Sequence, residues 1–234
     1  MGLRGVLFDL DGTLADTASA EREAWPGVAA LLAAHVPDVD VEELHVRYYS
    51  VFERHWVDYI SGRIGFSEYR RGRLADALAP WCTISDELFE AYRSEKRRGL
   101  ERLRLFHDAL TTLHGLRSAG LRIGLLTNGP SELQREKLAI TLLEPELDAV
   151  AISEEIGVAK PDAAAFEQAA AMIGCSPTDV AMVGDSPEAD IAGALGAGVP
   201  LAVLVTRGLD VVADGATVIE TLEALPPLLG VRAP

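Results

Sequence analysis

Two kinds of hydrophobic pattern alternate along much of the chain. Short, continuous apolar runs rich in Val, Ile and Leu occupy residues 3–10, 121–127, 148–153, 179–185 and 200–206. Longer segments between them, such as residues 131–143 and 163–173, repeat apolar positions every three or four residues. The continuous runs predict strands buried on both faces, and the longer repeats predict helices. We therefore expect an α/β fold with a Rossmann-like parallel sheet wrapped by helices.

Residues 17–104 depart from this alternation, because only the helical pattern occurs there. The segment also holds all three Trp, all five Tyr and three of the six Phe residues. Such a shift predicts a separate module of about four packed helices, inserted into the α/β fold. We expect a catalytic core made of residues 1–16 and 105–234, and a helical insertion made of residues 17–104.

Composition and charge exclude several classes of protein. Hydrophobic residues make up 49% of the chain and charged residues 24%, which is ordinary for a globular protein. The formal net charge of −15 repels nucleic-acid phosphates. No apolar run is long enough to span a membrane, and the two cysteines have no metal or disulfide spacing. We expect a cytoplasmic protein with no nucleic-acid or membrane partner; the pattern indicates no oligomeric state.

Polar residues gather where the predicted strands end. Asp9 and Asp11 follow the first strand, Thr127 and Asn128 the second, and Asp185 the fourth. In parallel sheets, ligands bind beyond the carboxyl ends of the strands. The sequence therefore predicts a site at this edge of the sheet.

Four carboxylates belong to this predicted site. Strand periodicity places Asp9 and Asp11 on the same side of the chain, and Asp185 and Asp190 follow another strand end. Any one of them alone could equally be a helix cap or a turn residue. Several carboxylates in one crevice repel one another unless a cation neutralises them, and oxygen ligands suit Mg²⁺. Together they predict a magnesium site.

Three further residues could hold a phosphoryl group. Thr127 offers a hydroxyl, the Asn128-Gly129 turn offers backbone N–H groups, and Lys160 offers a compact positive charge. Taken alone, Thr-Asn-Gly indicates a turn and Lys160-Pro161 a surface loop.

Four segments, taken in order, resemble the motifs of the haloacid dehalogenase (HAD) superfamily. They are DLDGTL at 9–14, LLTNG at 125–129, Lys160 within GVAKPD, and GDSPEAD at 184–190. The resemblance covers the whole chain, and the helical insertion is similar to the type 1 cap of that superfamily. The stretches TNGPSELQREKL and AISEEIGVAKPD most resemble the branch of bacterial pyrimidine nucleoside monophosphatases and N-acylneuraminate 9-phosphate phosphatases.

The resemblance implies a role for each of the four aspartates. Asp9 would be the nucleophile that forms an aspartyl-phosphate, and Asp11 the general acid and base. Asp9, Asp11 (through its backbone carbonyl) and Asp185 would bind Mg²⁺, with Asp190 in support.

The resemblance also implies phosphate binding by Thr127, Asn128 and Lys160. The implied function is a Mg²⁺-dependent phosphatase of small phosphorylated metabolites, with nucleoside monophosphates as the leading substrates. Dehalogenases of the superfamily lack an acid at the position of Asp11, which favours phosphate esters instead. The alternatives are a sugar-phosphate or phosphoglycolate-type phosphatase, a phosphomutase, and a non-enzymatic module that stores phosphate on Asp9.

Overall fold

The computed structural model describes residues 2–231 and divides into two compact units. The core unit comprises Met1–Thr17 and Leu103–Pro234, and the helical unit comprises Ala18–Arg102. No helix in the described part is both long and apolar enough to cross a membrane. Both cysteines, Cys82 and Cys175, are free thiols.

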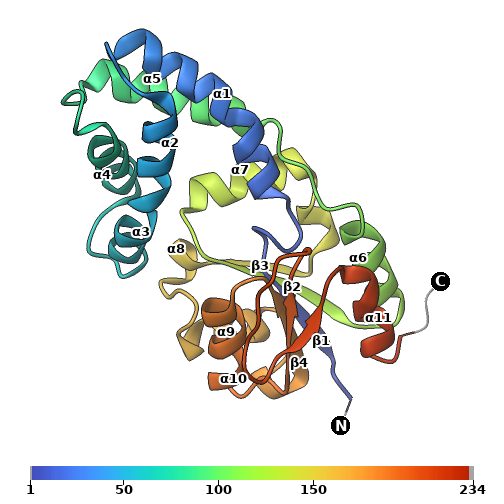
Figure 1. Cartoon of the computed structure of the whole chain (residues 1–234). Helices are drawn as coiled ribbons and strands as arrows, with labels where there is room; N and C mark the ends of the chain where they lie inside the picture. Colours follow the sequence, from blue (N-terminus) through green and yellow to red (C-terminus); the bar gives the residue numbers. More distant parts are fainter. Residues whose placement is uncertain (1, 232–234) are drawn as a thin grey trace. The chain divides into compact units, whose positions relative to one another are not determined.

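A six-stranded, fully parallel sheet forms the centre of the core unit (Figure 1). The strands stand in the order β3-β2-β1-β4-β5-β6, so the direction in which strands are added reverses at β1. Such a reversal is where doubly wound sheets bind ligands. The strands are β1 (Gly5–Phe8), β2 (Arg122–Thr127), β3 (Ala149–Ile152), β4 (Val180–Gly184), β5 (Leu201–Val205) and β6 (Thr217–Ile219).

The predicted α/β fold is confirmed, and each of the five predicted strands is present, with its ends at or within two residues of the predicted ones. The sixth strand, β6, was not predicted. It has three residues, two of them not fully buried, so it lacks the continuous apolar run that marks the others.

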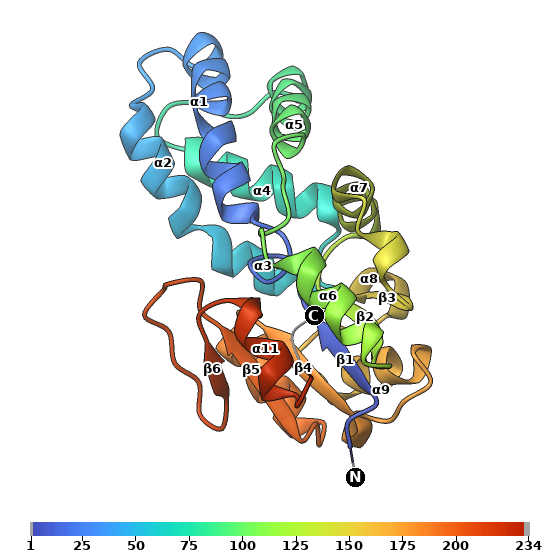
Figure 2. The same ribbon diagram turned by 90° about the vertical axis from the view of Figure 1, so that its right-hand side faces the viewer.

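Helices cover both faces of the sheet. On one face lie α9 (Ala163–Met172), the π-helical segment η3 (Pro187–Ala192) and α10 (Gly193–Gly196). On the other lie α6 (Ala109–Ser118) and α11 (Leu225–Leu228), which stand in front of the sheet in Figure 2. The remaining elements of the unit are α7 (Ser131–Thr141), α8 (Ser153–Ile156), η1 (Glu144–Glu146), η2 (Pro177–Asp179) and η4 (Leu222–Ala224).

Helix α9 shows why the sequence folds this way. Its run of alanines has high helical propensity, and the Asp162 side chain accepts a hydrogen bond from the backbone N–H of Ala164 as an N-cap. Phe166 and its neighbours on one face of the helix are buried against Leu7, Leu126 and Met182 of the sheet. A fully buried side chain of this size contributes about 1.5–3 kcal/mol.

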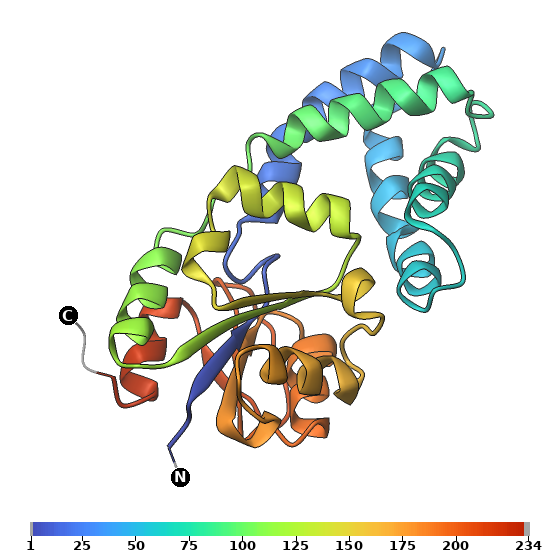
Figure 3. The ribbon, with the colours of Figure 1, turned by 180° about the vertical axis from the view of Figure 1, so that it is seen from behind.

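The helical unit has five helices rather than about four. They are α1 (Thr17–His35, its first residue in the core unit), α2 (Val41–Ser50), α3 (Phe52–Ile60), α4 (Phe66–Leu78) and α5 (Asp86–Leu100). The difference arises at Val51, which ends α2 and begins α3 within one continuous helical pattern. Helices α1 and α5 run side by side (Figure 3). They approach so closely at Gly99 that a Cβ atom added there would lie 2.4 Å from the Cβ atom of Ala24, which leaves room only for glycine. The unit has its own core, which includes Leu32, Leu44, Leu74, Leu78 and Tyr92.

Candidate active site

The sheet brings one polar residue from each of four strand ends into a row. Asp9 follows β1, Thr127 ends β2, Ser153 follows β3 and Asp185 follows β4. Phe8 of β1 is in register with Leu125 of β2 and Val183 of β4, so these strand ends lie at the same level. The predicted polar edge therefore forms at the carboxyl ends of neighbouring strands.

Three of the four predicted carboxylates meet there. One oxygen each of Asp9, Asp185 and Asp190 lies within 4.8 Å of the others. Asp190 comes from η3, is 1% exposed, and accepts a hydrogen bond of 2.9 Å from the backbone N–H of Ser186. Glycines allow this crowding: a Cβ on Gly12, which has a φ of +79°, would lie 2.1 Å from Asp185 Oδ2.

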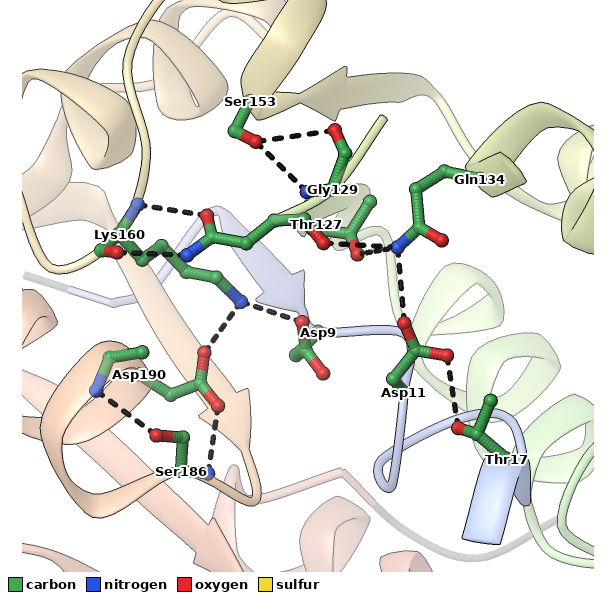
Figure 4. A network of polar contacts seen from close by, with 12 residues as sticks. Asp9, Asp11, Thr17, Thr127, Gly129, Gln134, Ser153, Lys160, Ser186 and Asp190 are labelled. Carbon is green, nitrogen blue, oxygen red and sulfur yellow. Dashed lines mark hydrogen bonds and ion pairs between the residues drawn. The ribbon is translucent and has the colours of Figure 1, made fainter. Parts of the chain in front are cut away.

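Lys160 joins two of these carboxylates. Its Nζ lies 2.6 Å from Asp9 Oδ1 and 2.6 Å from Asp190 Oδ1, and the residue is 3% exposed (Figure 4). Burial alone would lower the pKa of Lys160, but the charges of Asp190 and Asp9 outweigh this effect and raise it.

Asn128 fixes the loop that carries Lys160. Its side-chain Nδ2 donates to the backbone oxygen of Lys160 at 2.8 Å, and its Oδ1 accepts from the backbone N–H of Lys160 at 2.9 Å. Both polar atoms of the Asn128 side chain are thus used within the protein, which ties β2 to the Lys160 loop.

The three clustered carboxylates are incompletely neutralised. Burial raises the pKa of Asp9 well above its usual value, and nearby carboxylates add to that effect against the opposing charge of Lys160. Desolvation, followed by the charge of Asp190, raises the pKa of Asp185 to about 7. Across residues 2–231, no side chain forms an ion pair with Asp185. Carboxylate oxygens in need of a further positive charge fit a hard divalent cation such as Mg²⁺.

Asp11 is not one of the three clustered carboxylates, but its charge acts on two of them, Asp9 and Asp185. Strand β1 ends at Phe8, so Asp11 belongs to a turn, and strand periodicity does not decide on which side of the chain it lies relative to Asp9. Its two carboxylate oxygens each lie 2.7 Å from Lys137 Nζ. Gln134 Nε2 donates to its Oδ2 at 3.1 Å and the Thr17 hydroxyl to its Oδ1 at 2.9 Å (Figure 4). Burial alone would raise the pKa of Asp11, but Lys137 and these hydrogen bonds lower it.

Thr127 is held by the same helix. Gln134 Nε2 donates to Thr127 Oγ1 at 2.6 Å and to the backbone oxygen of Asn128 at 3.3 Å. Thr127 is 1% exposed, so its side chain is rigidly placed beside the other residues at the strand ends.

Sequence reasoning missed Gln134 and Lys137, the two residues of α7 that contact the site. Their spacing of three residues puts them on one face of a helix, a signal that could have been used. Ser153, directly after β3, contacts the loop that follows β2: its hydroxyl accepts from the backbone N–H of Gly129 at 2.9 Å.

The turn that follows Asp11 is also held by a residue far along the chain, Arg207. Arg207 Nη2 donates to the backbone oxygen of Thr13 at 2.6 Å, while its Nη1 pairs with Asp108 at 2.6 Å. No spacing in the sequence signals this contact, because 194 residues separate Arg207 from Thr13.

Buried acidic groups, a buried lysine and a threonine at the switch point of a doubly wound sheet define a hydrolase site of the α/β class. Residues 3–198 match the family model described as haloacid dehalogenase-like hydrolase. The chain belongs to this family of hydrolases and is an enzyme.

Curated relatives of the chain are phosphatases. N-acylneuraminate-9-phosphatase of Rattus norvegicus is 30% identical over 227 residues, which cover 88% of this chain and 85% of that protein. Pyrimidine 5'-nucleotidase YjjG of Escherichia coli is 30% identical over 82% of each chain. Phosphoserine phosphatase of Thermus thermophilus is 45% identical over 123 residues, which are 53% of this chain and 47% of that protein.

A solved structure has the same fold. The putative HAD-hydrolase YfnB from Bacillus subtilis superposes with a TM-score of 0.80, at 24% identity, over 99% of this chain and 100% of that one.

Proposed function

We propose that the chain is a Mg²⁺-dependent phosphatase that hydrolyses small phosphomonoesters through an aspartyl-phosphate on Asp9. The observation that carries the proposal is the meeting of Asp9, Asp185, Asp190 and Lys160 at the carboxyl ends of β1 and β4. Residues 1–16 and 105–234 would form the catalytic core, and residues 17–104 the type 1 cap.

The reaction divides into two displacements at phosphorus. A carboxylate oxygen of Asp9 attacks the phosphorus, the bond to the ester oxygen breaks, and Asp11 gives that oxygen a proton. Water then attacks the phosphorus of the aspartyl-phosphate, and Asp11 takes up a proton from it. The bond between phosphorus and Asp9 breaks, which restores the carboxylate and releases inorganic phosphate.

The remaining residues stabilise charge on the transferring group. Lys160, already in contact with Asp9, would bind the phosphoryl oxygens, and Thr127 would donate its hydroxyl hydrogen to another. Asn128 would contribute by holding the Lys160 loop in place.

Asp9 and Asp185, with the backbone carbonyl of Asp11, are the groups we assign to Mg²⁺, and Asp190 supports them. When bound, the ion would neutralise the carboxylates and polarise the phosphoryl group.

For the substrate, we propose nucleoside monophosphates, supported by the 30% identity with a pyrimidine 5'-nucleotidase over 82% of each chain. A sugar phosphate is the second candidate, supported by the equal identity with N-acylneuraminate-9-phosphatase.

The test is phosphate release from nucleoside monophosphates, sugar phosphates and p-nitrophenyl phosphate, with Mg²⁺ or with a chelator. We expect release with Mg²⁺, loss of release with the chelator, and a fall of more than about 10³-fold in Asp9→Asn, since the nucleophile is removed. Asp210→Asn, the same change on an exposed loop, should keep full activity.

Each other outcome has a definite meaning. If the wild type released phosphate from none of these esters, the proposal that the chain is a phosphatase would be overturned. Transfer of phosphate between positions of a sugar phosphate would identify a phosphomutase, and a stable acyl-phosphate without turnover would identify a phospho-acceptor module. The ranking of good substrates decides between nucleotides and sugar phosphates.

A further inference from the structure

Helix α7 surrounds the Asp11 side chain with hydrogen-bond donors. Lys137 Nζ contacts both carboxylate oxygens at 2.7 Å, and Gln134 Nε2 contacts Oδ2 at 3.1 Å. The Thr17 hydroxyl contacts Oδ1 at 2.9 Å. An ammonium has three donors and no acceptor, so the carboxylate can only accept in this arrangement.

Lys137 is unusual for a lysine on a surface helix. Only 6% of the residue is exposed, and its single ion pair within the described chain is with Asp11. Burying an ammonium is costly unless it is paired, so the fold maintains this contact for Asp11. The neighbouring Arg135 instead points to Glu144 and Glu155 on the exposed side of α7.

The side-chain amide of Gln134 also donates to the Asp11 carboxylate and helps to fix its orientation. Its Nε2 has two hydrogens, which are shared among three nearby acceptors on Asp11, Thr127 and Asn128. Its Oε1 is buried and has no hydrogen-bond partner within the described chain. An unpaired buried oxygen is unfavourable, so the contacts that Nε2 makes on the other side must hold the amide in this orientation.

We propose that Lys137, assisted by Gln134, is a positioning residue that holds Asp11 as the proton acceptor for hydrolysis of the aspartyl-phosphate. The inference rests on the proposed function and refines it. The α7 contact favours the second displacement, in which Asp11 takes a proton from the attacking water. It therefore ensures that phosphate on Asp9 is released and does not accumulate.

A substrate with a good leaving group separates the two displacements. p-Nitrophenolate leaves from phosphorus without a proton, so formation of the aspartyl-phosphate from p-nitrophenyl phosphate does not need an acid. That first step determines kcat/KM, whereas the hydrolysis of the intermediate limits kcat once it becomes slow.

The experiment compares the wild type with Lys137→Met, which keeps the length of the side chain but removes its charge. We expect kcat for p-nitrophenyl phosphate to fall by at least about tenfold, within the 10²–10⁴-fold range of acid–base catalysis. The value of kcat/KM should stay within about threefold, and the fraction of enzyme trapped as hydroxylamine-sensitive acyl-phosphate should rise. Lys137→Arg, which keeps a cationic donor, should recover part of kcat.

Arg135→Met is the matched control, since it removes a cation from the same helix without touching Asp11. It should match the wild type in kcat and in trapped acyl-phosphate. If Lys137→Met fails to fold, Lys137→Gln provides the same comparison with a neutral side chain.

Two results would overturn the inference. One is an equal fall of kcat and kcat/KM with no rise in acyl-phosphate, and the other is unchanged kinetics in Lys137→Met. In both cases the wild type still hydrolyses the ester, so the proposed function stands. Failure of the proposed function differs, because then the wild type releases no phosphate.

Discussion

The Thr127 hydroxyl has its direction set by a neighbouring side chain. Its oxygen accepts a hydrogen bond of 2.6 Å from Gln134 Nε2, so its own hydrogen is directed elsewhere. The hydroxyl is thereby prepared as a donor before any ligand binds. A preorganised donor of this kind is what a developing negative charge on a phosphoryl oxygen requires.

Replacing that donor should impair catalysis without unfolding the core. We expect Thr127→Val, which keeps the shape of the side chain, to lower kcat/KM for phosphate esters by about 10²-fold, the effect of losing one preorganised donor. Thr127→Ser keeps the hydroxyl and should stay within about fivefold of the wild type. Thr112→Val, at another buried threonine of the same unit, is the control in steady-state assays. Equal activity of both Thr127 variants would contradict the role of the hydroxyl.

Two elements of the helical unit are joined by a buried pair of tyrosines. The hydroxyls of Tyr48 on α2 and Tyr92 on α5 hydrogen bond to each other, and the two residues are 3% and 2% exposed. Neither hydroxyl has another hydrogen-bond partner within residues 2–231. Each therefore depends on the other, because a buried hydroxyl without a partner is destabilising.

Breaking this pair should destabilise the helical unit. We expect Tyr92→Phe to lower the free energy of unfolding by about 1–2 kcal/mol, since the Tyr48 hydroxyl loses its partner. The double variant Tyr48→Phe/Tyr92→Phe should lose no more unfolding free energy than the single variant, because only the single variant leaves a buried hydroxyl without a partner. Urea titration by tryptophan fluorescence measures this unit, as all three tryptophans lie within it. Tyr49→Phe, at a partly exposed ring, should change little; additive losses in the double variant would refute the coupling.

At the level of elements, the sequence was informative where burial is uniform. Strands β1, β2, β4 and β5 are buried along almost their whole length, so their apolar runs revealed them. Strand β6 and the break at Val51 were missed, because a three-residue edge strand and a one-residue break between two helices leave no periodic signal. Within the candidate site, the strand-end aspartates could be found from their positions. The Lys137–Asp11 contact spans 126 residues and needed the three-dimensional fold.

The whole molecule is strongly acidic, and its negative charge is distributed unevenly between the helical segment and the rest of the chain. Residues 17–104 contain 13 basic and 15 acidic residues, so most of the net charge of −15 lies outside them. A divalent cation at Asp9 and Asp185 would add positive charge where the core unit lacks it.

Metal binding should therefore stabilise the folded core unit. We expect Mg²⁺ to raise the midpoint of thermal unfolding, followed by circular dichroism, in line with about 2.7 kcal/mol at a hundredfold excess over Kd. Asp185→Asn should abolish the shift, whereas Asp210→Asn should retain it. Sodium chloride at equal ionic strength separates binding from screening. A shift that persists in Asp185→Asn would remove that residue from the metal site.

The order of the strands also has a consequence for folding during synthesis on the ribosome. Strand β1 is synthesised first, yet its two neighbours, β2 and β4, begin at Arg122 and Val180. Both of its edges stay without partners until well after the whole helical unit has been made, and unpaired apolar edges invite association between chains. The nascent chain thus carries the apolar strand Gly5–Phe8 without strand partners throughout the synthesis of the helical unit, so chaperone protection of this segment is expected to matter during translation.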